Sequence, residues 1–377
     1  MTKPLKVHLI AAARPNFMKV APLYHALQRA AWCAPVLVHT GQHYDHNMSG
    51  AFLAELGLPD PDYHLDVGSG SHAEQTAGVM VAYEKICQTE RPDWVVVAGD
   101  VNSTLACSLV AAKLLIPIAH LEAGLRSGDR TMPEEVNRIV TDRLADLLWT
   151  PSPDGDENLR GEGVAAENID RIGNIMIDSF ELQRAEIEAL AMAETLGLKA
   201  GGYSVVTLHR PSNVDQPETL QVIVDALLKL AEQLPLVFPI HPRSKARLAE
   251  FGLLNKLSAH PAVQLIEPQP YNAFMSLIMS ARLIITDSGG LQEETTYLGI
   301  PCLTLRDNTE RPITVSEGTN RLVKAGDLAG QVQAILDGKG KTGRRPDLWD
   351  GRAAERAAES LRRHAMARIN EEMGETL

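Results

Sequence analysis

The sequence predicts an α/β protein with two doubly wound domains, each a parallel sheet covered by helices, facing one another across a cleft. Three observations support this fold class. The chain has 377 residues, which suggests two domains at roughly 100–200 residues per domain. Short apolar runs alternate with segments whose apolar residues recur every three or four positions, as expected for buried parallel strands separated by helices. This alternation runs twice, and the Gly-rich residues 197–202 separate the two series.

Strands are expected where β-branched and other apolar residues form short runs. In chain order these runs are Lys6–Ala12, Val36–His39, Trp94–Ala98, Ile118–Leu121, Ser204–Leu208, Leu236–Ile240, Val263–Ile266, Leu283–Thr286 and Cys302–Leu305. The helical patterns are Thr104–Leu115, Pro133–Leu144, Ile175–Leu196, Thr219–Leu234, Leu291–Leu298 and Arg352–Met373. We expect one domain over residues 1–174 and another over residues 175–354, with a terminal helix at about residues 355–375 packing back on the first.

Composition and charge limit the classes of protein to be considered. Apolar residues make up 45% and charged residues 22% of the chain, which is typical of a globular protein with a sizeable core. The 36 basic and 48 acidic side chains leave a net charge of −12, so we expect no broad basic surface for nucleic acid or anionic lipid. The four cysteines lie far apart without a CxxC pair, and no apolar run reaches the roughly 18–20 residues of a membrane span. We therefore expect a cytoplasmic protein that binds neither nucleic acid nor a membrane.

Unusual polar residues follow the expected strands in both halves of the chain. The carboxyl ends of parallel strands lie at one edge of a sheet, where open α/β folds bind their ligands. Seven such loops, divided between the two halves, predict a single site between the domains. Their polar residues are Arg14, Gly41-Gln42-His43, Asp100, Glu122, His209-Arg210, His241-Pro242-Arg243 and Asp287-Ser288-Gly289-Gly290.

The segment Thr286-Asp287-Ser288-Gly289-Gly290 follows a strand and opens a helix. Its two glycines let a phosphate approach the backbone, and the free N–H groups at a helix N-terminus attract an anion. The alternative is an ordinary helix start, in which Ser or Asp caps the first turn. Glu293-Glu294, one turn further on, would either bind a ribose diol or simply favour the N-terminus of the helix.

Acidic residues at strand and helix ends are candidates for proton transfer. A carboxylate at the end of a central strand, such as Asp100 or Glu122, is desolvated and costly unless it is used or paired. Glu134 is different, because Pro133-Glu134-Glu135 also fits a plain helix start with Pro in the first position and acids in the first turn. An i,i+4 pair between Glu134 and Arg138 would complete that structural interpretation, which the local sequence favours.

Two other patterns are weak. His39, His43, Asp45 and His46 straddle a strand end and a loop without helical i,i+4 spacing, so we expect no metal site there. Gly68-x-Gly70-x-x-Ala73 matches a loose dinucleotide fingerprint, but it lies outside the first strand–helix unit and lacks a firm acidic partner. We therefore expect neither a metal nor a cofactor.

Several motifs follow one another in a specific order and spacing from Arg14 to about Arg321. They are Ala13-Arg14-Pro15 with Lys19, Gly41-Gln42-His43, Gly99-Asp100, His120-Leu121-Glu122-Ala123-Gly124-Leu125-Arg126, Pro133-Glu134-Glu135-Val136-Asn137-Arg138, Gly173-Asn174, Thr207-Leu208-His209-Arg210, Thr286 to Glu294, and Thr309-Glu310-Arg311-Pro312. Together these motifs resemble those of the non-hydrolysing UDP-N-acetylglucosamine 2-epimerases. The resemblance implies a GT-B-type fold of two Rossmann-like domains and conversion of UDP-GlcNAc into UDP-ManNAc without NAD or metal, for cell-surface polysaccharide precursors. Some relatives act instead on diacetamido-uronate sugars, and we also expect a homodimer.

The same resemblance implies roles for individual residues. Asp100, Glu122 and Glu134 would form the acid/base group, with His209 at the diphosphate or the leaving oxygen. The implied substrate contacts are Arg14, Lys19 and Arg138 for phosphate or carboxylate orientation, Ser288, Gly289 and Gly290 for the diphosphate, Glu294 for the ribose, Arg311 at the cleft, and Gln42, His43 and His241.

The sequence leaves two alternatives, one a different enzyme and one a protein of another class. A GT-B glycosyltransferase has the same fold and donor, but transfer needs one base and an open acceptor groove rather than the three carboxylates Asp100, Glu122 and Glu134. A sugar-nucleotide-binding regulator that has lost catalysis would have no need for these carboxylates. Incubation with UDP-GlcNAc alone distinguishes the three, since it gives an isomer, free UDP plus sugar, or no product.

Overall fold

The computed structural model describes residues 3–41, 53–372 and 374. The chain divides into two compact units, unit 1 with residues 1–182 and 347–377 and unit 2 with residues 183–346. The first division falls inside helix α7 (Ile175–Ala189), which the expected boundary places wholly in the second domain. The second division falls before residue 347, whereas the expected boundary follows residue 354.

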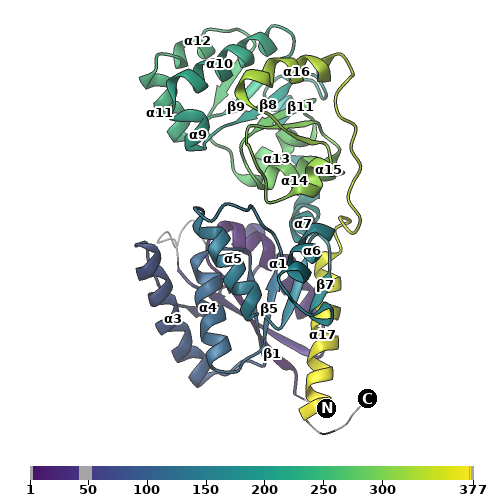
Figure 1. The fold of residues 1–377 in the computed structure, drawn as a ribbon. Coiled ribbons are helices and arrows are strands. Elements are labelled where there is room, and N and C mark those ends of the chain that lie inside the picture. The colour runs from purple at the N-terminus through teal and green to yellow at the C-terminus, as the bar shows by residue number, and fades with distance from the viewer. Residues whose placement is uncertain (1–2, 42–52, 373, 375–377) are drawn as a thin grey trace. The chain divides into compact units, whose positions relative to one another are not determined.

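Unit 1 is built on a parallel sheet with seven strands among the described residues, in the order β3-β2-β1-β4-β5-β6-β7 (Figure 1). Successive strands move outward from β1 in one direction and from β4 in the other. The strand order therefore reverses between β1 and β4, which is where doubly wound sheets bind ligands. The strands are β1 (Leu5–Ala11), β2 (Cys33–His39), β3 (Tyr63–His64), β4 (Trp94–Ala98), β5 (Ile118–Leu121), β6 (Leu147–Thr150) and β7 (Ile169–Arg171).

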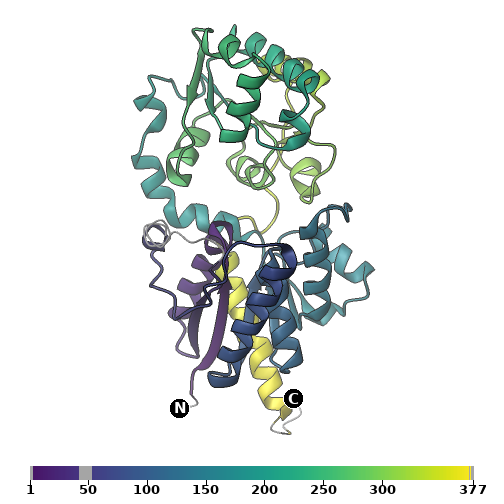
Figure 2. The same cartoon turned by 90° about the vertical axis from the view of Figure 1, so that its left-hand side faces the viewer.

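Helices cover both faces of this sheet, because right-handed crossovers leave β1 and β4 in opposite directions. Tyr83 of α3 and Val110 of α4 pack into the same core as Val95 and Val97 of β4. The terminal helix α17, yellow in Figures 1 and 2, packs against α1. The helices of unit 1 are α1 (Arg14–Gln28), α3 (His72–Thr89), α4 (Asn102–Lys113), α5 (Pro133–Leu144), α6 (Pro153–Gly161), η1 (Ala166–Asn168) and α17 (Ala353–Glu372), with the first part of α7.

Unit 2 repeats this plan with a parallel sheet in the order β10-β9-β8-β11-β12-β13, so its strand order reverses between β8 and β11. Its main core lies where α10 and α16 meet the sheet, around Leu227, Leu328 and Ile285. The strands are β8 (Ser204–Thr207), β9 (Leu236–Pro239), β10 (Val263–Ile266), β11 (Leu283–Thr286), β12 (Cys302–Thr304) and β13 (Asn320–Leu322). The helices are α8 (Met192–Thr195), α9 (Pro211–Val214), α10 (Pro217–Ala231), α11 (Pro242–Glu250), α12 (Leu254–Ser258), α13 (Tyr271–Met279), α14 (Gly290–Leu298), α15 (Pro312–Ser316), η2 (Ala325–Asp327) and α16 (Leu328–Leu336).

The two parallel sheets confirm the predicted fold class, and the differences are local. The expected strands are all present, but β3, β6, β7 and β13 were not predicted. The helix expected over Ile175–Leu196 is interrupted, because Ala191 has a φ of 43° and separates α7 from α8. Among the described residues, every helix is too short or too polar to cross a bilayer.

Candidate active site

Lys19 of α1 and Glu122, which follows β5, form a buried ion pair in unit 1. Their side chains are only 10% and 5% exposed, so water screens the attraction between them weakly. Gly99, at the end of β4, lies beside this pair, since a Cβ on it would stand 2.7 Å from Lys19 Nζ. Gly99 also has a φ of 67°, so both the backbone and the available space require glycine here.

The backbone of Glu122 is itself unusual. Its φ of 74° lies in the left-handed region, which costs a residue with a side chain roughly 1–3 kcal/mol. Strain of this kind persists only where the surroundings hold it, and it is most common at functional sites. The geometry therefore marks Glu122 independently of its place in a motif.

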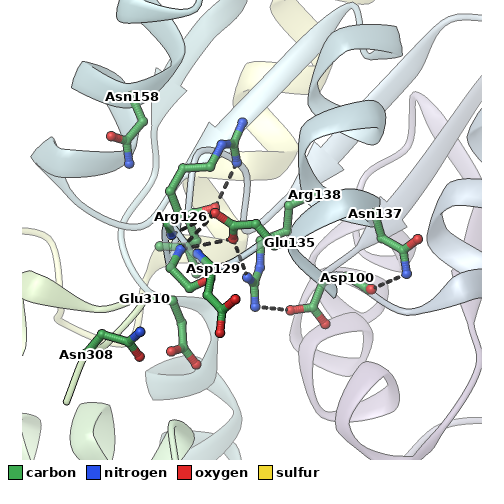
Figure 3. Close-up of polar contacts among 12 residues, drawn as sticks. Asp100, Arg126, Asp129, Glu135, Asn137, Arg138, Asn158, Asn308 and Glu310 are labelled. Carbon is green, nitrogen blue, oxygen red and sulfur yellow. Dashed lines mark hydrogen bonds and ion pairs between the residues drawn. The ribbon is translucent and has the colours of Figure 1, made fainter. Parts of the chain in front are cut away.

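Asp100 and Arg138 form a second pair near the carboxyl ends of these strands (Figure 3). Arg138 Nη2 lies 2.5 Å from Asp100 Oδ2, and Arg138 Nη1 lies 3.0 Å from Glu135 Oε2. Asn137 donates its amide to the backbone carbonyl of Asp100 at 2.8 Å. The side chain of Arg138 is 6% exposed and that of Asp100 is 23% exposed. The guanidinium is thus fixed between two carboxylates, while Asp100 stays partly accessible to solvent.

The structure corrects the pair expected between Glu134 and Arg138. Arg138 is bound by Glu135, three residues before it, and by Asp100. Glu135 also accepts hydrogen bonds from the backbone N–H groups of Ser127 and Gly128 at 2.9 Å each. Glu134 is half-buried, and its side chain makes no hydrogen bond or ion pair with any residue that the structure describes. The structural role thus belongs to Glu135, and the Glu134 carboxylate is available for chemistry.

In unit 2 a buried aspartate joins the two strands at which the strand order reverses. Asp287 follows β11 and is fully buried, and it accepts hydrogen bonds from the backbone N–H groups of His209 and Arg210, which follow β8. Its Oδ1 lies 2.8 Å from Nδ1 of His209, and Asn213 donates to its Oδ2 at 3.1 Å. Burial alone would raise the pKa of Asp287, but these donors outweigh it and hold the pKa below its usual range.

The glycines after Asp287 leave the N-terminus of α14 open. Gly289 is the N-cap residue and no side chain caps this helix, so the expected alternative of a Ser or Asp cap is wrong. A Cβ on Gly289 would lie 2.7 Å from Glu310 Oε1, whereas a Cβ on Gly290 would meet nothing within 4 Å. The first N–H groups of the helix are therefore available to an anion.

Glu294 of α14 is a buried carboxylate near a network of ion pairs. Tyr271 donates its hydroxyl to Glu294 Oε1 at 2.8 Å. Arg311 Nε lies 2.7 Å from Glu293 Oε2, and Arg311 Nη1 lies 2.6 Å from Glu310 Oε1. Burial raises the pKa of Glu294 to about 7, and the neighbouring Glu293 adds to this shift. Because burial disfavours the charged form, Glu294 can take up or release a proton near neutral pH.

This shift predicts a pH-dependent stability. The folded protein binds the Glu294 proton more tightly than the unfolded chain does, so the free energy of unfolding falls as the pH rises from about 4.5 to about 7. A pKa difference of one unit corresponds to about 1.36 kcal/mol. Above pH 7 the free energy of unfolding of the Glu294→Gln variant should therefore exceed that of the wild type by up to about 3 kcal/mol, and in acid the two should be equal. Urea unfolding at several pH values measures the difference. Parallel stability curves for the two proteins would contradict this assignment.

Several predicted binding residues remain untested by this geometry. Gln42 and His43 lie outside the described residues, as do Asp45 and His46 of the candidate metal cluster. For Arg14 the structure describes only the backbone, as the first residue of α1.

His241 begins α11 and accepts a hydrogen bond from the backbone N–H of Arg243 at its Nδ1. Its ring centroid lies 5.8 Å from that of His209, so the structure brings these two predicted residues together in unit 2. Arg243 pairs with Asp215, and Arg210 donates its Nε to the carbonyl of Asp287.

Three contributors were not predicted in the roles that they have here. Asp287 was visible in its motif, but the sequence offered only a capping role for it. Glu135 stands beside Glu134, and which of two adjacent acids faces inward depends on how α5 packs. Tyr271 has no sequence signal that links it to Glu294, because the contact joins the successive helices α13 and α14 and depends on how they pack.

Comparisons with known proteins identify the family of the chain. Residues 25–362 match the family model described as UDP-N-acetylglucosamine 2-epimerase. The chain is 42% identical over 367 residues to the UDP-N-acetylglucosamine 2-epimerase of Methanocaldococcus jannaschii, covering 90% of this chain and 97% of that protein. It is 41% identical over 327 residues to the UDP-2,3-diacetamido-2,3-dideoxy-D-glucuronate 2-epimerase of Pseudomonas aeruginosa, covering 85% of this chain and 89% of that protein.

Solved structures are similar over nearly the whole chain. The crystal structure of the Methanocaldococcus jannaschii UDP-GlcNAc 2-epimerase with UDP-GlcNAc and UDP matches with a TM-score of 0.80 and 40% identity, over 95% of this chain and 100% of that one. The Neisseria meningitidis UDP-GlcNAc 2-epimerase bound to UDP-GlcNAc matches with a TM-score of 0.84 and 28% identity, over the same shares.

Proposed function

The chain belongs to the UDP-N-acetylglucosamine 2-epimerase family, and on this premise we propose that it inverts C2 of UDP-GlcNAc to give UDP-ManNAc, and catalyses the reverse. The observation that carries the proposal is the group of carboxylates in unit 1. Lys19 holds Glu122, Arg138 holds Asp100, and Glu134 is left without a partner among the described residues. These are the groups that a proton transfer at carbon requires.

The chemistry explains why more than one carboxylate is needed. The hydrogen on C2 is barely acidic, because no carbonyl group is attached to that carbon. As the C1–O bond to UDP breaks, positive charge develops at C1, and a base can remove the C2 proton to leave a C1=C2 double bond. A proton then returns to the opposite face of C2, and UDP adds back at C1. One group must remove the proton and another must supply it from the other face, which Asp100, Glu122 and Glu134 can share.

Unit 2 would stabilise the departing UDP. The open N-terminus of α14 and the glycines before it suit the diphosphate, and Glu294 suits the ribose diol. His209 is held at Nδ1 by Asp287, which leaves Nε2 for the diphosphate or the leaving oxygen. The helix N-terminus and His209 would stabilise charge that grows as the C1–O bond breaks, so these two would act on the transition state more than on the bound substrate, whereas Glu294 would bind both alike.

The substrate has one specific competitor. The relative from Pseudomonas aeruginosa acts, by its name, on UDP-2,3-diacetamido-2,3-dideoxy-D-glucuronate, and its identity to this chain is nearly that of the GlcNAc epimerase. Incubating the purified protein with each UDP-sugar and comparing kcat/KM for the two decides between them.

We expect deuterium from solvent at C2 of the product. In D₂O the removed proton is replaced by a deuteron, so each UDP-ManNAc molecule formed from UDP-GlcNAc should carry deuterium at C2. Mass spectrometry gives the extent of labelling and proton NMR gives its position. Product that retains protium at C2 would contradict elimination and favour a hydrogen returned internally. Free UDP plus sugar as the main product would instead favour a transferase or a hydrolase.

The surroundings of the activity are proposed from the same family membership. The protein would act as a homodimer in the cytoplasm and supply a precursor for cell-surface polysaccharide. The cysteines that the structure describes are free thiols and are buried, in agreement with a reducing compartment. Light scattering on the protein as it elutes from a size-exclusion column measures its mass in solution and tests whether it is a dimer.

A further inference from the structure

His120 of β5 is buried between two hydrogen-bond acceptors. It has no exposed surface, its Nε2 lies 2.8 Å from the carbonyl oxygen of Gly99, and its Nδ1 lies 2.6 Å from Oδ1 of Asp142. A carbonyl oxygen can only accept a hydrogen bond, so Nε2 must carry a proton. If Asp142 is ionised, it also can only accept, and Nδ1 must then carry a second proton.

The surroundings of Asp142 keep it ionised. Its Oδ2 accepts a hydrogen bond from the backbone N–H of Gly124 at 3.1 Å and lies 2.7 Å from Arg126. Two contacts other than His120 therefore stabilise the carboxylate form of Asp142: the guanidinium of Arg126 by its charge, and the N–H of Gly124 as a hydrogen-bond donor. Arg126 is also paired with Glu162 at 2.8 Å. Arg126 thus lies between two carboxylates, the buried Asp142 and Glu162, whose side chain is 40% exposed.

We infer that His120 is an imidazolium and that, with Asp142, it forms a positioning pair for the proton-transfer carboxylates. The inference rests on the proposed function, because it takes the roles of those carboxylates from there. The pair joins β4, β5 and α5, and each of these three elements leads to or contains one of the proton-transfer carboxylates. The carbonyl that His120 binds immediately precedes Asp100, the N–H that Asp142 binds lies two residues after Glu122, and Asp142 itself belongs to α5, which begins beside Glu134.

The loops that this pair binds need an external support. Gly99, Glu122 and Gly124 all have left-handed backbones, with φ of 67°, 74° and 80°. Loops in these conformations lack the repeating backbone hydrogen bonds of a helix or strand. Hydrogen bonds from neighbouring side chains must therefore fix the direction in which their own side chains point. The other charged groups beside Gly99 are Lys19 and Glu122, which pair with each other. Because His120 has no exposed surface and binds the carbonyl of Gly99, it would act on these loops through their backbone rather than on substrate.

The protonation state is tested on the unmodified protein. An ordinary exposed histidine is neutral at about pH 8 and has one bare ring nitrogen. Nitrogen NMR of histidine-labelled protein at that pH, with His120 assigned through its backbone resonances, should show protons on both of its ring nitrogens. A bare ring nitrogen at His120 would overturn the inference. The NMR measurement does not depend on enzyme activity. A wild-type protein without epimerase activity would therefore refute the proposed function but not the protonation state inferred for His120.

The positioning role is tested with a pair of amides. His120→Gln and Asp142→Asn should each lower kcat by about 10- to 100-fold with KM changed much less, because displacement of a catalytic group by about 1 Å costs that much. In the double variant, the introduced Gln amide can donate to the carbonyl of Gly99 and accept from the new Asn, so the double variant should regain part of the lost kcat.

Asp146→Asn is the matched control, since Asp146 accepts a hydrogen bond from the N–H of Ile118 at the other end of the same strand. It should lower stability and leave kcat unchanged. Unchanged kcat in a folded single variant, or a double variant no better than the singles, would overturn the role.

Discussion

The Glu134→Gln variant should lose about 10²–10⁴-fold in kcat, which is the usual worth of a positioned acid or base. Glutamine keeps the size of the side chain and the possibility of hydrogen bonding, but it cannot exchange a proton with carbon. Glu134 makes no contact with described residues that this change would break. The free energy of unfolding should therefore change by only a few tenths of a kcal/mol, as for an acid in the first turn of a helix. Steady-state rates and urea unfolding of the same preparation give both quantities.

Two further variants isolate this effect. Glu218 follows Pro217 at the start of α10, as Glu134 follows Pro133 at the start of α5. Glu218→Gln therefore makes the same change in the same helical position, and it should leave kcat unaltered. Glu135→Gln keeps one oxygen that can accept from the Ser127 and Gly128 N–H groups, but it replaces the carboxylate oxygen that binds Arg138 with an NH₂ donor, so it should cost roughly 1–3 kcal/mol of stability. A folded Glu134→Gln variant with near-normal kcat would refute its catalytic role.

The central strands were predictable because their burial leaves a plain signal in the sequence. All five residues of β4 are buried, and its predicted bounds are those of the structure. Three of the four strands that were missed, β3, β7 and β13, are edge strands of two or three residues, whereas β6, beside β7, has four buried residues and was missed in spite of that length. A run of two or three residues cannot show a period, and pairing with a neighbouring strand decides its conformation. The break at Ala191 is of the same kind, since an alanine in a left-handed conformation goes against its local preference.

The candidate site was predictable to the level of residue type but not of partner. That Asp100, Glu122 and the glycines after Asp287 follow strands could be read from the sequence. That Lys19 pairs with Glu122 could not, because 103 positions separate the two residues and only the packing of α1 on the sheet brings them together. Glu135 shows the same limit at short range. The choice between Glu134 and Glu135 as the partner of Arg138 depends on which side of α5 faces the loop at residues 127–128.

The Gly290→Asp variant should lose affinity for UDP by at least about 100-fold, since it places a carboxylate where the diphosphate is expected to bind. The structure makes this a test of charge rather than of folding. A Cβ at Gly290 meets nothing within 4 Å, and an acidic side chain in the first turn of a helix is itself favourable. Gly330→Asp on α16 adds the same side chain, also with nothing within 4 Å of its Cβ. It should keep the affinity of the wild type.

Calorimetric titration with UDP gives the two dissociation constants, and thermal unfolding with and without UDP gives a second reading. A ligand that binds only the folded state raises Tm by mass action, so UDP should raise Tm in the wild type and in Gly330→Asp but not in Gly290→Asp. The three proteins without UDP should unfold at nearly the same temperature. If Gly290→Asp binds UDP as tightly as the wild type does, then the N-terminus of α14 is not the diphosphate site. The departing UDP would then need another source of positive potential. Arg311 and Arg306 could not provide it without leaving Glu310, the carboxylate that now pairs with both.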